Sequence, residues 1–127
     1  MRTGLWWVAL LLVAVVVAGC GGRGAQENQG SEAATTVTII GKDNVYEPVT
    51  VEIKAGQEYE FLFKNQGQGA HNVVIQSKAQ AGQDFSSDLT VNPDDESKFK
   101  VKITQAGTYT MQCTLHTEMK GELKVAQ

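Results

Sequence analysis

The sequence predicts an all-β domain, most simply a Greek-key β-sandwich of about seven to eight short antiparallel strands. From Thr35 onward, short runs rich in Val, Ile, Phe, Thr and Tyr are separated by Gly, Pro, Asn and Asp, which is typical of strands joined by turns. No segment after Thr35 has a helical apolar period long enough to bury a helix, and only Gln76–Gln83 favours a turn or two. A small β-barrel is the alternative arrangement.

Seven segments carry the strand pattern. In order along the chain they are Val37–Ile40, Val49–Lys54, Tyr59–Lys64, Asn72–Gln76, Lys98–Ile103, Thr108–Gln112 and Glu122–Val125. Alternation is clear in the fifth segment, where Phe99, Val101 and Ile103 alternate with polar residues. Successive side chains of a strand point to opposite faces, so each such strand has one buried face and one face in water.

The N-terminal part of the chain has the composition of an export signal followed by a tether. Leu5–Ala18 is apolar and uncharged and follows Arg2; at about 14 residues it suits a signal peptide better than the roughly 20 residues of a membrane span. The sequence Val17-Ala18-Gly19-Cys20 resembles a bacterial lipobox, which implies cleavage before Cys20 and lipid attachment to its sulfur. A plain signal peptide or an uncleaved anchor is the alternative.

These patterns divide the chain into three parts. Residues 1–19 are the predicted lipoprotein signal peptide, and residues 20–34 are the lipidated cysteine with a flexible tether, because Gly21–Ala34 contains no large apolar side chain. Residues 35–127 are the predicted folded domain.

The net charge excludes one class of partner. Removal of Arg2 with the signal leaves ten basic residues (11 minus Arg2) against 14 acidic ones. The resulting net charge of about −4 argues against a nucleic-acid partner.

Cysteine usage points to a metal. Two cysteines in an exported protein would ordinarily pair as a disulfide. If Cys20 carries lipid, Cys113 remains a free thiol in an oxidising compartment, and metal ligation accounts for its presence.

The motif Cys113-Thr-Leu-His116-Thr-Glu-Met119 lies between two predicted strands, where a tight loop lets three side chains converge. Thiolate and thioether are soft ligands, and two histidines with one cysteine and a weak axial methionine form the ligand set of blue-copper sites. Zinc takes four strong ligands more often. His71 is the chain's other histidine, so the predicted ligands of one copper ion, cycling between Cu(I) and Cu(II), are His71, Cys113, His116 and Met119.

These motifs resemble the cupredoxin family over about residues 35–127. The spacing Cys113-x-x-His116-x-x-Met119 is similar to the short loop of amicyanin, whereas plastocyanins and azurins space the same ligands more widely. Further segments that carry the resemblance are Tyr46-Glu47-Pro48, Lys54-Ala55-Gly56, Asn65 six residues before His71, His71-Asn72-Val73-Val74 and Gly107-Thr108-Tyr109. The resemblance implies that Asn65 braces the ligand loops and that a backbone N–H near Asn72 points at the Cys113 sulfur.

The predicted function is that of a membrane-tethered type 1 (blue) copper protein that carries single electrons. The resemblance implies that His116 reaches the surface and is the electron exit, with Leu115, Gly69 and Ala70 offering a rim for transient contact with redox proteins. Four bound side chains leave no open position for catalysis, which argues against an enzyme. Copper storage or delivery is the alternative, and a structural lipoprotein is a third hypothesis. The expected protein is a monomer, lipid-anchored to the outer face of a bacterial membrane, in the periplasm or at the cell surface.

Overall fold

The computed structural model describes residues 34–127. The predicted signal peptide, Cys20 and the tether up to residue 33 lie outside the described residues. Within the described range, no helix is long and apolar enough to cross a lipid bilayer.

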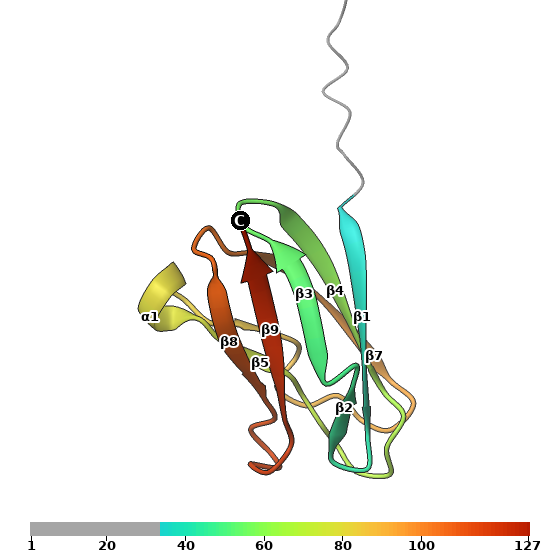
Figure 1. Ribbon diagram of the computed structural model, residues 1–127. Helices are drawn as coiled ribbons and strands as arrows, with labels where there is room; N and C mark the ends of the chain where they lie inside the picture. The colour runs from blue at the N-terminus through green and yellow to red at the C-terminus, as the bar shows by residue number, and fades with distance from the viewer. Residues whose placement is uncertain (1–33) are drawn as a thin grey trace, which may run out of the picture. The chain divides into compact units, whose positions relative to one another are not determined.

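Two sheets pack face to face as a β-sandwich (Figure 1). The first has the order β2 (Val45–Glu47), β1 (Thr35–Lys42), β4 (Glu58–Asn65), β7 (Glu96–Lys102), and the second has the order β3 (Thr50–Lys54), β9 (Lys120–Ala126), β8 (Gly107–Gln112), β5 (Val74–Gln76), β6 (Phe85–Ser86). A single helical turn, α1 (Lys78–Ala81), lies between β5 and β6 in sequence. The chain crosses between the sheets after β2, β3, β4, β6 and β7. The predicted all-β, Greek-key sandwich is therefore confirmed.

The structure differs from the sequence prediction in three details. The described residues form nine strands, because the short strands β2 and β6 join the seven predicted segments. Two of the strand pairs, β1 with β4 and β3 with β9, are parallel, although antiparallel strands were expected throughout. The fourth predicted strand begins at Val74, not at Asn72, because His71 forms an isolated bridge to Val91 instead of a continuous ladder.

The core forms between the two sheets from the apolar face of each strand. In β4, buried and partly exposed residues alternate, so that Tyr59, Phe61 and Phe63 point inward; in β9, Leu123 and Val125 do the same from the other sheet. This is the two-residue period of a strand with one wet face.

The outer face of β4 and β7 carries three cross-strand ion pairs. They are Lys64–Glu96 at 3.6 Å, Lys98–Glu60 at 3.3 Å and Lys100–Glu58 at 3.1 Å. Each is solvent-exposed, so each contributes less than about 1 kcal/mol to stability.

Several loops gather at the end of the sandwich opposite the C-terminus (Figure 1). One is the turn of the β1–β2 hairpin, where Lys42 pairs with Val45 and the two residues between them, Asp43 and Asn44, have positive φ angles of 50° and 62°. Two residues of this conformation make the turn that matches the twist of a hairpin. Asn44 Nδ2 donates to Glu118 Oε1 at 3.0 Å, which ties this turn to the loop between β8 and β9.

Candidate metal centre

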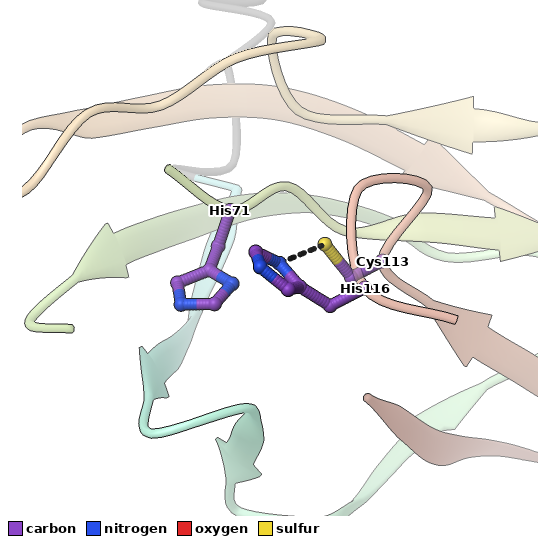
Figure 2. Close-up of side chains that lie close together, drawn as sticks. All are labelled: His71, Cys113 and His116. Atoms are coloured by element: carbon purple, nitrogen blue, oxygen red, sulfur yellow. Dashed lines mark hydrogen bonds between the residues drawn. The ribbon is translucent and has the colours of Figure 1, made fainter. Parts of the chain in front are cut away.

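Three of the predicted ligands converge at this end of the sandwich. The ligand atoms of His71, Cys113 and His116 all lie within 4.8 Å of one another. Figure 2 shows that they come from two separate segments: the His71 ring faces the His116 ring, and the Cys113 sulfur lies beside His116. The His116 Nδ1 to Cys113 Sγ distance is 3.9 Å, and the centroids of the two imidazole rings are 4.6 Å apart.

The segment from Cys113 to Met119 is a loop closed at its base. Cys113 follows the last residue of β8, and its N–H donates to the Met119 carbonyl oxygen at 3.1 Å. The Met119 N–H donates to the His116 carbonyl oxygen at 3.0 Å. These bonds close the loop, so the main chain of Met119 returns to Cys113 and His116 without a helix.

The Met119 side chain is fully buried, like that of Cys113. Its methyl group lies against Gly41 of β1, where an added Cβ would come within 3.2 Å of Met119 Cε and 2.7 Å of Phe63 Cζ. A larger residue at position 41 would have to displace one of these groups. Gly41 therefore provides the room that Met119 and Phe63 occupy, a role that was not inferred from the sequence.

His71 is held by main-chain pairing and by Asn65. The His71 N–H donates to the Val91 carbonyl at 3.1 Å, and the Val91 N–H donates to the His71 carbonyl at 3.0 Å. Asn65 Nδ2 donates to the carbonyl oxygens of Val91 and Gly69, both at 2.8 Å, and Asn65 Oδ1 accepts from the Gly67 N–H at 2.9 Å. The structure thus places Asn65 where it connects the loop before His71 to the strand segment that His71 pairs with.

Asn72 links the two ligand segments through both its backbone and its side chain. Its N–H points at Cys113 Sγ at 3.5 Å. Its side-chain Nδ2 donates to Thr114 Oγ1 at 2.7 Å and to the Leu89 carbonyl at 2.8 Å, while its Oδ1 accepts from the Thr114 N–H at 2.8 Å. Sequence reasoning anticipated the backbone contact and missed the side-chain contacts, because only the folded chain brings Thr114 next to Asn72.

Tyr46 supports the same segment from β2. Its hydroxyl donates to the Asn72 carbonyl oxygen at 2.7 Å, and its ring packs edge-on against Phe63 at a centroid distance of 6.2 Å. Burial, with a smaller contribution from Cys113, raises the pKa of Tyr46 far above its ordinary value, so the hydroxyl keeps its proton and remains a donor. The segment Tyr46-Glu47-Pro48 was noted in the sequence, but this role was not assigned to it.

Comparison with known proteins establishes the family. A family model described as a cupredoxin-like domain matches residues 7–125 of the chain. This chain belongs to the cupredoxin-like family. A plastocyanin from Dryopteris crassirhizoma is 34% identical to this cupredoxin over an alignment of 88 residues, with a coverage of 61% of this chain and 84% of the plastocyanin.

Solved structures share the fold of this cupredoxin. Auracyanin A from Chloroflexus aurantiacus, described as a "blue" copper protein, aligns with a TM-score of 0.61 at 20% identity, covering 72% of this chain and 98% of auracyanin A. A reduced amicyanin variant aligns with a TM-score of 0.56 at 21% identity, covering 71% of this chain and 81% of amicyanin.

The cofactor of the cupredoxins is one copper ion, and the residues of this cluster fit it. Metal bonds to nitrogen and thiolate sulfur are about 2.0 to 2.3 Å long, so donor atoms as close as these can share one ion. His71 Nδ1 is the one buried side-chain nitrogen or oxygen of the described residues without a hydrogen-bond partner, and Cys113 is a buried free cysteine. Burial, and the neighbouring His116, lower the pKa of His71, while Asp43 opposes them. The imidazole is therefore held neutral, the form that binds metal.

Proposed function

We propose that this cupredoxin is a type 1 (blue) copper protein that carries single electrons, with His71, Cys113, His116 and Met119 as the copper ligands. The observation that carries the proposal is the partnerless, buried Nδ1 of His71, which lies in one cluster with a buried free thiol and a second histidine. A buried polar atom without a partner costs about 1 to 3 kcal/mol, and metal ligation removes that cost. The soft sulfur of Met119 at the base of the same loop completes the donor set.

The surrounding hydrogen bonds support electron transfer. Copper bound by such ligands exchanges one electron between Cu(I) and Cu(II). Asn72 connects the two ligand segments, Asn65 joins the loop before His71 to Val91, and Tyr46 holds the Asn72 carbonyl. Ligands fixed in this way keep nearly the same positions in both oxidation states, which lowers the rearrangement required at each transfer.

The exposure of the site supports exchange with a protein partner. Cys113 and Met119 are fully buried, whereas His116 is half-buried and the neighbouring Leu115 is 47% exposed. We assign His116 as the electron exit and the rim formed by exposed Leu115 with Gly69 and Ala70 as the contact for transient redox partners. Four side-chain ligands would leave no open position on the ion, so the proposed role is a carrier and not an enzyme.

The proposal extends to the N-terminal part of the chain. The lipobox-like segment ending at Cys20 supports a lipid anchor, and the composition of residues 20–34 supports a flexible tether that lets a monomeric domain reorient toward its partners. The protein would then act at the outer face of a bacterial membrane, in the periplasm or at the cell surface.

Titration of the purified copper-free protein with Cu(II) tests the proposed centre. We expect one copper per chain and an intense visible band from charge transfer between the thiolate and Cu(II). Cys113→Ser replaces the soft thiolate by a hydroxyl and should abolish the band while the circular dichroism of the fold is retained. Cys20→Ser is the matched control, since it makes the same exchange at the chain's other cysteine and should leave the band unchanged.

The same titration separates the alternatives. A protein that binds only Cu(I) and stays colourless would favour copper storage or delivery over electron transfer. Failure to bind either oxidation state, or a full-strength band in Cys113→Ser, would contradict the ligand assignment.

A further inference from the structure

The metal centre has one side that opens to solvent. A hollow of about 350 Å³ lies there, lined by Asp43, Asn44, Gln68, Gly69, His71 and His116. We call it the access hollow. Both histidines of the centre line it, whereas the buried sulfur ligands Cys113 and Met119 do not. The hollow therefore borders both histidines of the centre, of which His116 is half-buried and His71 is buried.

The access hollow is polar and is bordered by Gly69. An added Cβ at this exposed position would lie 3.9 Å from His116 Cε1, in ordinary van der Waals contact, so a larger side chain there would begin beside the histidine. The side-chain amides of Asn44 and Gln68 offer neutral oxygen atoms around the rim. An ion in the hollow therefore has both oxygen atoms and the two imidazoles among its neighbours.

Asp43 supplies the negative charge of the access hollow. It is the only carboxylate among the residues that line it, and its charge acts on His71 by favouring a positive charge there. A carboxylate that stabilises positive charge at His71 also attracts a cation approaching the same place, and hollows of one sign of charge raise the rate at which ions of the other sign arrive.

The turn that carries Asp43 is joined to the ligand loop by a hydrogen bond. Asp43 and Asn44 form the two-residue turn of the β1–β2 hairpin, and Asn44 donates a hydrogen bond of 3.0 Å to Glu118, which lies between His116 and Met119. The turn and the ligand loop are thus held side by side, although 74 residues separate Asn44 from Glu118 in sequence.

We propose that the access hollow is the route by which a copper ion reaches this centre from solvent, and that Asp43 is the first group to attract and bind the incoming ion before His71 and His116 take it over. The proposal rests on the proposed function, since it requires that the cluster bind copper. It assigns to Asp43 a role in the rate of metal uptake and none in the final coordination.

Rapid mixing of the copper-free protein with Cu(II), followed by growth of the thiolate band, tests this route. Asp43→Asn should slow uptake about three- to tenfold at low ionic strength, because one attracting charge is lost. The difference should shrink in 1 M salt, where the screening length is about 3 Å. The final spectrum and the rate of copper release to a chelator should stay as in the parent, since Asp43 is not a final ligand.

Asp94→Asn is the matched control. Asp94 is also exposed and also has a positive φ, of 66°, so the substitution removes the same charge from a similar backbone conformation outside the access hollow. Uptake by this variant should match the parent. Gly69→Leu, which adds apolar bulk to a residue that lines the hollow without adding charge, should slow uptake at both low and high salt.

Three results would overturn the route: parent-like uptake by Asp43→Asn, parent-like uptake by Gly69→Leu, or equal slowing by Asp94→Asn. In each case the band would still form, so the proposed function would stand. Absence of the band from the parent protein would instead contradict the proposed function, and the route with it.

Discussion

At the scale of single residues, His71 takes its chemical character from its surroundings. Its side chain is 2% exposed, its Nδ1 has no hydrogen-bond partner, and burial lowers its pKa. A buried imidazole that stays neutral is prepared to donate its lone pair to a metal. The same features make the copper-free protein sensitive to acid.

The lowered pKa of His71 gives a prediction of pH dependence. An unfolded chain takes up a proton on this histidine near the ordinary pKa of about 6.5, whereas the folded copper-free chain does so only at lower pH. At a pH between the His71 pKa values of the two states, the unfolded state therefore binds more protons. The free energy of unfolding should then fall as the pH is lowered from about 7.5 to 5.5. Urea unfolding of the copper-free protein across this range measures the slope. His71→Gln should flatten it, and an equally steep slope in that variant would contradict the assignment.

Met119 is assigned as the axial ligand on the basis of its place in the loop and its soft sulfur. Met119→Leu should preserve copper binding and raise the reduction potential, because the axial ligand tunes the potential more than the affinity. A tenfold loss of preference for Cu(II) over Cu(I) corresponds to a rise of about 59 mV for a one-electron couple. Voltammetry of the copper-loaded protein measures this shift.

Met111→Leu is the control for that experiment. Met111 is an equally buried methionine in β8, outside the loop, so the same exchange there should leave the potential near that of the parent. An unchanged potential in Met119→Leu, or the same rise in both variants, would remove Met119 from the ligand set.

At the scale of elements, the centre depends on connections between loops that are distant in sequence. Asn72 is fully buried and its side chain joins Leu89 and Thr114 by three hydrogen bonds. Asn72 therefore holds the loop after β8 against the segment before β5, and the spacing of the two ligand segments depends on it.

Asn72→Ala should lower the free energy of unfolding by about 1 to 3 kcal/mol, because it removes three partly buried hydrogen bonds. It should also broaden the spectrum of the copper-loaded protein, since the two ligand segments are no longer joined through this side chain. Thr114→Val, which removes only the hydroxyl that accepts from Asn72, should cost less than Asn72→Ala. Urea unfolding compares the three proteins, and an equal cost for both variants would contradict the role given to the remaining side-chain bonds.

At the scale of the whole described domain, the core extends well beyond the centre. The buried apolar cluster runs between the two sheets and includes Cys113 and Met119 at one end, but most of its residues are not proposed ligands. The fold is therefore expected to persist without metal, and the metal should add stability to a structure that already exists.

Removal of copper provides the test. The copper-free protein should keep the circular dichroism of the folded domain, and loading should raise its unfolding midpoint; free metal at one hundred times the dissociation constant corresponds to about 2.7 kcal/mol. Thermal unfolding with and without a chelator measures the difference. Loss of the β-sheet spectrum on copper removal would show that the centre is needed for folding.

The limits of prediction are visible in particular strands. Alternation such as that of Phe99 and Val101 in β7 predicts which face is buried, but it does not say which strand lies alongside. The parallel pairs β1–β4 and β3–β9 were missed for that reason. β2 was missed because it has only three residues, although Asp43-Asn44 is a turn signal between two strands. β6, with two residues, is too short to leave a pattern.

By itself, the sequence determined the donor chemistry: a thiol, two imidazoles and a thioether in an order and spacing suited to a blue-copper centre. The alternating runs predicted an all-β domain, most simply a β-sandwich. Only the tertiary structure decided that His71 lies beside the loop after β8 and that hydrogen bonds of Asn72 and Tyr46 stabilise this contact. It also decided that Asp43 lines the same open hollow as the two histidines. The physical reason is that residue types and local periods are properties of short segments. Contacts between residues distant in sequence depend instead on how the strands pair and how the sheets pack. They also depend on which buried polar groups find hydrogen-bond partners in the packed structure.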